Sequence, residues 1–114
     1  MITFACKKIE QEELIRCSFN LNKTEYNVLL FLLKNKNVIT VSGIAKAMNL
    51  ERTTVQKAIK TLVGKNLVKR MQKNLERGGY IYYYSVENKD EIKKRMKSIV
   101  HDWYKMVEKE INEL

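Results

Sequence analysis

The sequence predicts an α+β fold that is mainly helical, with one small β-hairpin and a long C-terminal helix. Between Ile44 and Leu62, apolar residues recur at helical spacing in two stretches separated by Asn49. Between Leu67 and Val86 the pattern changes to that of two β-strands around a Gly-Gly pair. From residue 88 to residue 114, apolar residues again recur every three or four positions, which predicts one long helix.

The first part of the chain is predicted to form two helices. A short amphipathic helix is expected from Glu10 to Cys17. Asn22 followed by Glu25 is the pattern of an N-cap with its acidic partner, so the second helix is expected from Lys23 to about Lys34. Its apolar side chains would form the spine of the core, and they are Tyr26, Leu29, Leu30, Leu32 and Leu33.

Two further helices follow a short extended segment. The β-branched run Val38–Val41 predicts a short strand or an extended piece, and Thr40 or Ser42 can cap the helix that follows. This helix is expected to end at Met48, and the next one to run from Arg52 to Lys65.

The segment from residue 44 to residue 62 has the pattern of a helix-turn-helix. Asn49 lies where the turn needs a residue that tolerates positive φ, and Leu50 fills the turn. The second helix has a buried stripe, formed by Val55, Ala58, Ile59 and Leu62. Its other face presents side chains of the kinds that contact base edges and phosphates, namely Arg52, Thr53, Gln56, Lys57 and Lys60, with Thr54 near the helix start. We therefore expect this helix to contact DNA.

The predicted hairpin directly follows this recognition helix and would form a wing. Its strands are expected at Leu67–Gln72 and Tyr80–Val86. At the tip, Gly78 permits a tight turn and Arg77 can enter a narrow minor groove. Arg70 and Lys73 on the first strand are expected near phosphates. The tyrosines of the second strand could stack on single-stranded bases, but we expect them chiefly to pack the ribbon and the core.

The last helix has more apolar surface than one chain needs. Ile92, Met96, Ile99, Trp103 and Met106 step by four and three residues, as in a coiled coil, and Val100, Val107 and Ile111 form an adjacent stripe. We expect two copies to pack through residues 88–114, with residues 1–87 forming the DNA-binding part of the same single domain. The alternative is that the helix folds back and is covered within one chain.

Charge and composition support a nucleic-acid partner. The net charge is +9, and nine basic residues against two acidic ones lie between Gly43 and Gly79. Concentrated positive charge favours polyanion binding through counterion release. The sequence has no catalytic motif, so we do not expect an enzyme or a cofactor.

The remaining observations concern location and cysteines. No signal peptide or transmembrane segment is indicated, so we expect a cytoplasmic protein. Two cysteines and one histidine are too few to indicate a metal site. Cys6 and Cys17 are expected to be buried and inert, with an intersubunit redox pair as the alternative.

The chain resembles the archaeal and bacterial winged helix-turn-helix regulators grouped around the TrmB-like and MarR-like families. The resemblance covers nearly the whole chain, and its carriers are Leu21–Tyr26, Ile44–Met48, Arg52–Ile59, Leu62, Leu67–Arg70, Arg77–Tyr80 and Trp103–Tyr104. It implies a homodimeric transcription factor that places the recognition helix in the major groove of double-stranded DNA and the wing at the minor groove. By this resemblance Thr53, Thr54, Gln56 and Lys57 face the groove, and Arg77 reads DNA at the wing tip. The effector domain of TrmB-like sugar sensors is not part of the resemblance.

Three functions remain open at this point. A sequence-specific regulator, most simply a repressor that occludes a promoter, is the leading hypothesis. An architectural DNA-binding protein would use the same charge with little base readout. An RNA-binding or interaction module would use the tyrosines of the hairpin.

Overall fold

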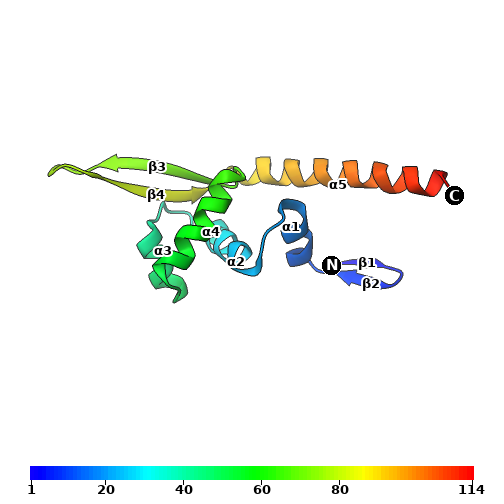
Figure 1. The fold of residues 1–114 in the computed structure, drawn as a ribbon, viewed down its shortest axis with the longest axis horizontal. Coiled ribbons are helices and arrows are strands. Elements are labelled where there is room, and N and C mark those ends of the chain that lie inside the picture. Colours follow the sequence, from blue (N-terminus) through cyan, green and yellow to red (C-terminus); the bar gives the residue numbers. More distant parts are fainter. The chain divides into compact units, whose positions relative to one another are not determined.

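The computed structural model describes all 114 residues, which form five helices and two β-hairpins (Figure 1). The predicted fold class is confirmed. In chain order the elements are β1 (Ile2–Phe4), β2 (Lys7–Ile9), α1 (Gln11–Phe19), α2 (Lys23–Lys34), α3 (Val41–Met48), α4 (Arg52–Gly64), β3 (Val68–Asn74), β4 (Tyr80–Val86) and α5 (Lys89–Asn112). No helix, not even α5, combines the length and apolar character that crossing a membrane requires.

The chain divides into two compact units. The central unit is Leu21–Glu87, and the terminal unit combines Met1–Asn20 with Asn88–Leu114. The division into these two units does not itself show which part binds DNA. The division into a DNA-binding part (1–87) and a dimerisation helix (88–114) therefore stays a prediction.

In the central unit, α2 and α3 both pack against α4. The apolar faces of these helices form the core, together with the start of the wing. Side chains with almost no exposed surface are Val28, Leu29, Leu32, Ile44, Val55, Leu62 and Leu67. Val28 thus joins the predicted spine of α2, whereas Leu30 and Leu33 are only half-buried.

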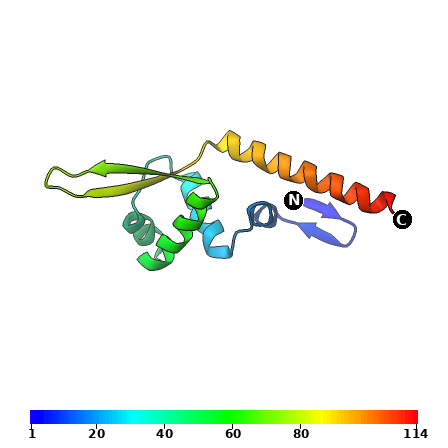
Figure 2. The same cartoon turned by 45° about the horizontal axis from the view of Figure 1, so that its top comes forward.

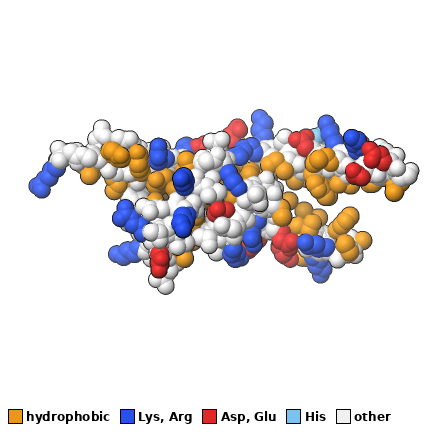
Figure 3. Space-filling view, viewed as in Figure 1, with side chains coloured by type: hydrophobic (Ala, Val, Ile, Leu, Met, Phe, Trp, Pro, Cys, Tyr) orange, Lys and Arg blue, Asp and Glu red, His pale blue; other side chains and the backbone are white.

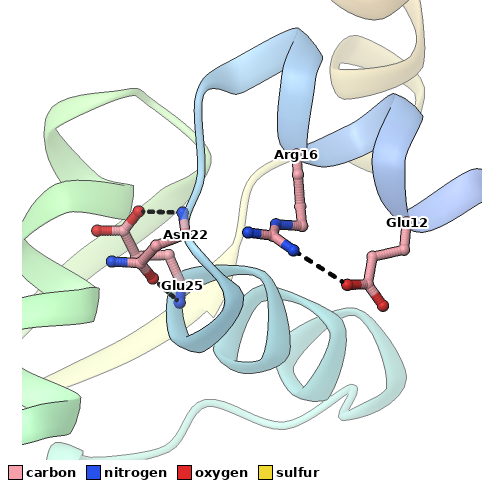
Figure 4. A network of polar contacts seen from close by, with 4 residues as sticks. All are labelled: Glu12, Arg16, Asn22 and Glu25. Carbon is pink, nitrogen blue, oxygen red and sulfur yellow. Dashed lines mark hydrogen bonds and ion pairs between the residues drawn. The ribbon is translucent and has the colours of Figure 1, made fainter.

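Local hydrogen bonds explain where α2 and α3 begin. The Asn22 side chain accepts a hydrogen bond from the Glu25 backbone N–H (2.8 Å), and the Glu25 carboxylate accepts one from the Asn22 N–H (2.9 Å; Figure 4). This reciprocal pair confirms the predicted N-terminus of α2. Thr40 caps α3 by accepting a hydrogen bond from the Gly43 N–H (3.0 Å).

Of the two forms expected at residues 38–41, a strand or an extended piece, the structure has a short extended piece. Only Ile39 bridges to Tyr84, through backbone hydrogen bonds of 3.0 and 2.7 Å. Val41 is already the first residue of α3, because the cap at Thr40 starts the helix there. The β-branched run therefore forms an extended piece with one bridge, and it ends at Thr40 because Val41 belongs to α3.

The wing is an antiparallel pair whose register joins Val68 to Val86 and Asn74 to Tyr80. The second strand has the predicted bounds, and the first extends two residues beyond the predicted end at Gln72. All residues from Lys69 to Tyr80 are exposed, whereas Val68 and Tyr84 at the other end are buried. The wing is thus anchored at its base and surrounded by solvent toward its tip.

The terminal unit contains β1, β2, α1 and α5 (Figures 1 and 2). Phe19 of α1 is buried, and the guanidinium of Arg95 on α5 lies 5.1 Å from the centre of its ring. Arg16 and Glu12 on α1 form an ion pair of 3.3 Å (Figure 4). Asn88 caps α5 by accepting hydrogen bonds from the Asp90 and Glu91 N–H groups.

Two features at the N-terminus differ from the sequence-based expectation. The β1–β2 hairpin was not predicted. Cys6, in its turn, and Cys17, on α1, are both exposed, so the expectation of buried thiols is wrong. The cause is that residues 1–8 are all exposed, and Cys17 lies on the solvent side of α1.

The capping box predicts a measurable loss of stability. Asn22→Ala removes the acceptor for the Glu25 N–H, and we expect it to lower the free energy of unfolding by about 1 kcal/mol. Asn22→Asp keeps an acceptor and should cost much less. Chemical denaturation followed by circular dichroism measures both variants. Equal stability of Asn22→Ala and the wild type would contradict the role of the cap.

Candidate nucleic-acid interface

The candidate recognition helix α4 has two distinct faces. Val55, Ala58 and Ile59 are buried against the other helices of the central unit. The opposite face is open to solvent and presents Arg52, Thr53, Gln56, Lys57 and Lys60. Thr54 is half-buried at the side of the helix. The exposure that the periodicity predicts is confirmed, whereas contact with DNA stays a prediction for each of these residues.

The turn between α3 and α4 holds the two helices in a helix-turn-helix. Asn49 adopts the left-handed conformation (φ 55°, ψ 48°), as predicted for this position. The Leu50 N–H then donates a hydrogen bond of 2.9 Å to the Ala45 carbonyl, which closes the end of α3. Because α3 also packs on α4, this turn fixes the direction in which α4 leaves it.

Positive charge surrounds the open face of α4. Figure 3 shows basic side chains over the helices of the central unit and at the tip of the wing. Lys46 on α3 is exposed and was not among the predicted contacts. Its signal in the sequence was its position on the polar side of the first helix of the motif.

The basic residues of the wing lie on different faces. Successive residues of a strand point to opposite sides, so Arg70 and Lys73, three positions apart, project in opposite directions. The guanidinium of Arg70 lies 4.3 Å from the centre of the Tyr82 ring, a cation–π contact. A DNA backbone that lies against one face of the wing can therefore contact only one of these two basic side chains directly.

The tip of the wing depends on two glycines. Gly78 (φ 90°) and Gly79 (φ 81°) both have positive φ. The turn is closed by hydrogen bonds from the Gly78 N–H to the Leu75 carbonyl (3.1 Å) and from the Leu75 N–H to the Gly79 carbonyl (3.0 Å). A Cβ on either glycine would meet no atom within 4 Å, so backbone conformation and not crowding requires glycine. Arg77, next to this pair, is exposed.

The tyrosines of β4 serve the wing in different ways. Tyr84 is buried at the base, and this burial raises the pKa of its phenol, while the nearby Arg70 opposes the shift. Tyr82 is half-buried, and its ring lies 5.1 Å from that of the exposed Tyr80. Tyr84 and Tyr82 therefore have packing partners inside the unit, in keeping with the expected structural role.

Most of the predicted dimerisation residues on α5 are open to solvent. Ile92 is buried within the terminal unit, and Met96 and Val107 are half-buried. The others form an exposed apolar surface of Ile99, Val100, Trp103, Met106 and Ile111. A row of large apolar side chains in water is typical of a surface that another protein covers.

No group of three or more His, Cys, Asp or Glu side chains is arranged to hold a metal ion. The central unit presents exposed basic, amide and hydroxyl groups on α4 and the wing.

Comparison with known proteins identifies the family. Residues 15–97 match the model of the family described as "Sugar-specific transcriptional regulator TrmB". The chain belongs to the TrmB family. Its match includes the helix-turn-helix, the wing and the first part of α5, so the members' classification as transcriptional regulators applies to the part of the chain that holds the candidate interface.

Two individual proteins are similar to this chain over most of its length. An uncharacterised protein of Methanocaldococcus jannaschii is 38% identical over 103 residues, which are 90% of this chain and 84% of the relative. A structure from Methanosarcina mazei Go1, described as a "possible transcriptional regulator", is 35% identical with a TM-score of 0.89 and is covered to 95%, with 99% of this chain aligned.

More distant structures share the fold alone. A variant of Staphylococcus aureus MepR bound to an oligodeoxyribonucleotide has a TM-score of 0.56 at 16% identity, over 91% of this chain and 73% of that one. It is one of the MarR-family winged-helix proteins among the structural neighbours. The predicted resemblance to both families is confirmed.

Proposed function

We propose that this protein is a homodimeric regulator that recognises specific sequences in double-stranded DNA and represses transcription by covering a promoter. The observation that carries the proposal is the open face of α4, which presents basic, amide and hydroxyl side chains from a helix-turn-helix. Membership of a family of transcriptional regulators supports it. So does the likeness in fold to a MepR variant bound to an oligodeoxyribonucleotide.

The side chains of α4 have two different tasks in this proposal. Gln56 can pair with adenine through two hydrogen bonds, and Arg52 with guanine, so these residues read bases in the major groove. Lys57 and Lys60 supply charge to phosphates, which increases affinity for every sequence. An architectural DNA-binding protein would need only the second group, and the basic character of α4 favours this as the alternative function.

The exposed surface of α5 supports the proposed homodimer. The distribution of charge along α5 indicates whether the two helices run parallel or antiparallel in it. Five basic and two acidic residues lie between residues 89 and 100, whereas residues 101–114 contain two basic and four acidic ones. Two copies of α5 in antiparallel orientation place the basic half of one against the acidic half of the other. A parallel pair would place like charges together, so the antiparallel arrangement is the one that we propose.

The two groups on α4 predict different effects of mutation. Gln56→Ala should cost about 1–3 kcal/mol on the specific site and nothing on random duplex DNA. Lys60→Ala should weaken both duplexes equally and reduce the slope of log affinity against log salt by about one. Fluorescence anisotropy titrations at several salt concentrations measure these effects, with Lys109→Ala on α5 as the charge control. Equal losses on both duplexes for Gln56→Ala would support the architectural alternative.

The wing tip predicts a preference for particular DNA on either side of the base pairs that α4 contacts. Positive charge gains most in a narrow minor groove, so A·T-rich flanks should bind more tightly than G·C-rich flanks. Arg77→Ala should remove this difference and leave the preference at central bases intact, whereas Lys73→Ala should weaken both kinds of duplex alike. Competition between duplexes that differ only in their flanks measures this difference in affinity for the wild type and for both variants. If the preference for A·T-rich flanks survives Arg77→Ala, Arg77 does not contact the minor groove.

The α5 surface predicts the oligomeric state. We expect the wild type to be a dimer at micromolar concentration and the double variant Ile99→Glu, Trp103→Glu to be a monomer, because buried glutamates would lack partners. His101→Glu introduces one glutamate at another exposed position outside the predicted apolar stripes and should leave the dimer intact. Sedimentation velocity measures all three proteins. A monomeric wild type, or a dimeric double variant, would refute dimerisation through α5.

A further inference from the structure

The N-terminal hairpin has one apolar face. Its register pairs Ile2 with Ile9 and Phe4 with Lys7, so these side chains share a side, whereas Thr3 and Lys8 point to the other. Ile2 is 50% exposed and Phe4 is 66% exposed. The ammonium of Lys7 lies 3.3 Å from the Glu13 carboxylate, which pairs the one charge on this face.

Such a hairpin needs a surface to pack on. Two short strands alone are at best marginally stable in water, because they bury too little apolar area. Within the chain, its large side chains remain mostly in solvent. A contact that covers these side chains would therefore come from outside the chain.

The hairpin and α5 belong to the same compact unit and lie beside each other. Figures 1 and 2 both show the hairpin alongside the C-terminal half of α5. Figure 3 shows apolar side chains on both elements, with a gap between them. In the C-terminal half of α5, Trp103, Met106 and Ile111 are 58%, 61% and 59% exposed. Both elements therefore expose large apolar side chains.

We propose that the β1–β2 hairpin is a second dimerisation element, and that α5 of a second copy packs between the hairpin and α5 of the first. This inference rests on the proposed homodimer. The occupant is assigned from charge, because the acidic C-terminal half of α5 beside the hairpin matches the basic N-terminal half of a second α5. Two-fold symmetry repeats the contact, so each hairpin covers the helix of the other chain.

A pair of matched variants tests the hairpin. Phe4→Asp places a charge on the apolar face, and we expect it to raise the dimer dissociation constant at least tenfold, as measured by sedimentation equilibrium on the full chain. Thr3→Asp introduces the same charge on the opposite face and should change the constant less than twofold. Trp103→Glu, measured in the same way, tests whether the dimer depends on the apolar surface of α5.

The outcomes separate this inference from the proposed function. If Trp103→Glu yields monomers while Phe4→Asp leaves the dissociation constant unchanged, the hairpin has no part in a dimer that still exists. If the wild type is a monomer, both proposals are wrong.

A second measurement needs no substitution and so avoids any effect of Phe4→Asp on folding. In dimers mixed from labelled and unlabelled chains, isotope-filtered nuclear Overhauser spectra should show contacts between the Phe4 ring of one copy and α5 methyl groups of the other. Contacts of Phe4 within its own chain only would overturn the inference.

Discussion

The burial of one face of α4 determines how the central unit presents itself to a partner. Val55, Ala58, Ile59 and Leu62 pack into the core, and α2 and α3 are both held against the helix by this contact. A helix buried on one side can only present the opposite side, and there the chain places Gln56 among basic residues. The same packing sets the start of the wing, because the Leu67 N–H donates a hydrogen bond of 3.0 Å to the Leu62 carbonyl.

The wing combines an anchored base with a tip in solvent, and this division suits a DNA contact. At the base, Tyr84 is buried and exchanges two backbone hydrogen bonds with Ile39. At the tip, two glycines with positive φ make the tight turn beside Arg77. A basic side chain at a solvent-exposed tip can reach a groove, while the buried base keeps its direction fixed relative to α4.

The sequence predicted those elements whose signals are local. The pair Asn22 and Glu25 located the start of α2, because a capping box is satisfied within four residues. The run of tyrosines and β-branched residues after Gly79 located β4. The hairpin of residues 2–9 was missed, because its strands have three residues each and its turn, Ala5-Cys6, has no glycine, asparagine or proline. The exposure of the cysteines follows from that same hairpin and from the position of Cys17 on α1. The opposite faces of Arg70 and Lys73 follow from their odd spacing along β3.

The central claim is that α4 reads a DNA sequence as part of a symmetric dimer. Selection of duplexes from a random pool by the full-length protein, followed by sequencing, tests it most directly. The account predicts enrichment of one motif with two related half-sites in inverted orientation, and loss of its base preferences when Gln56 and Arg52 are both replaced by alanine. A pool that binds tightly at low salt but yields no motif at any salt concentration would contradict the claim and identify a binder of DNA in general.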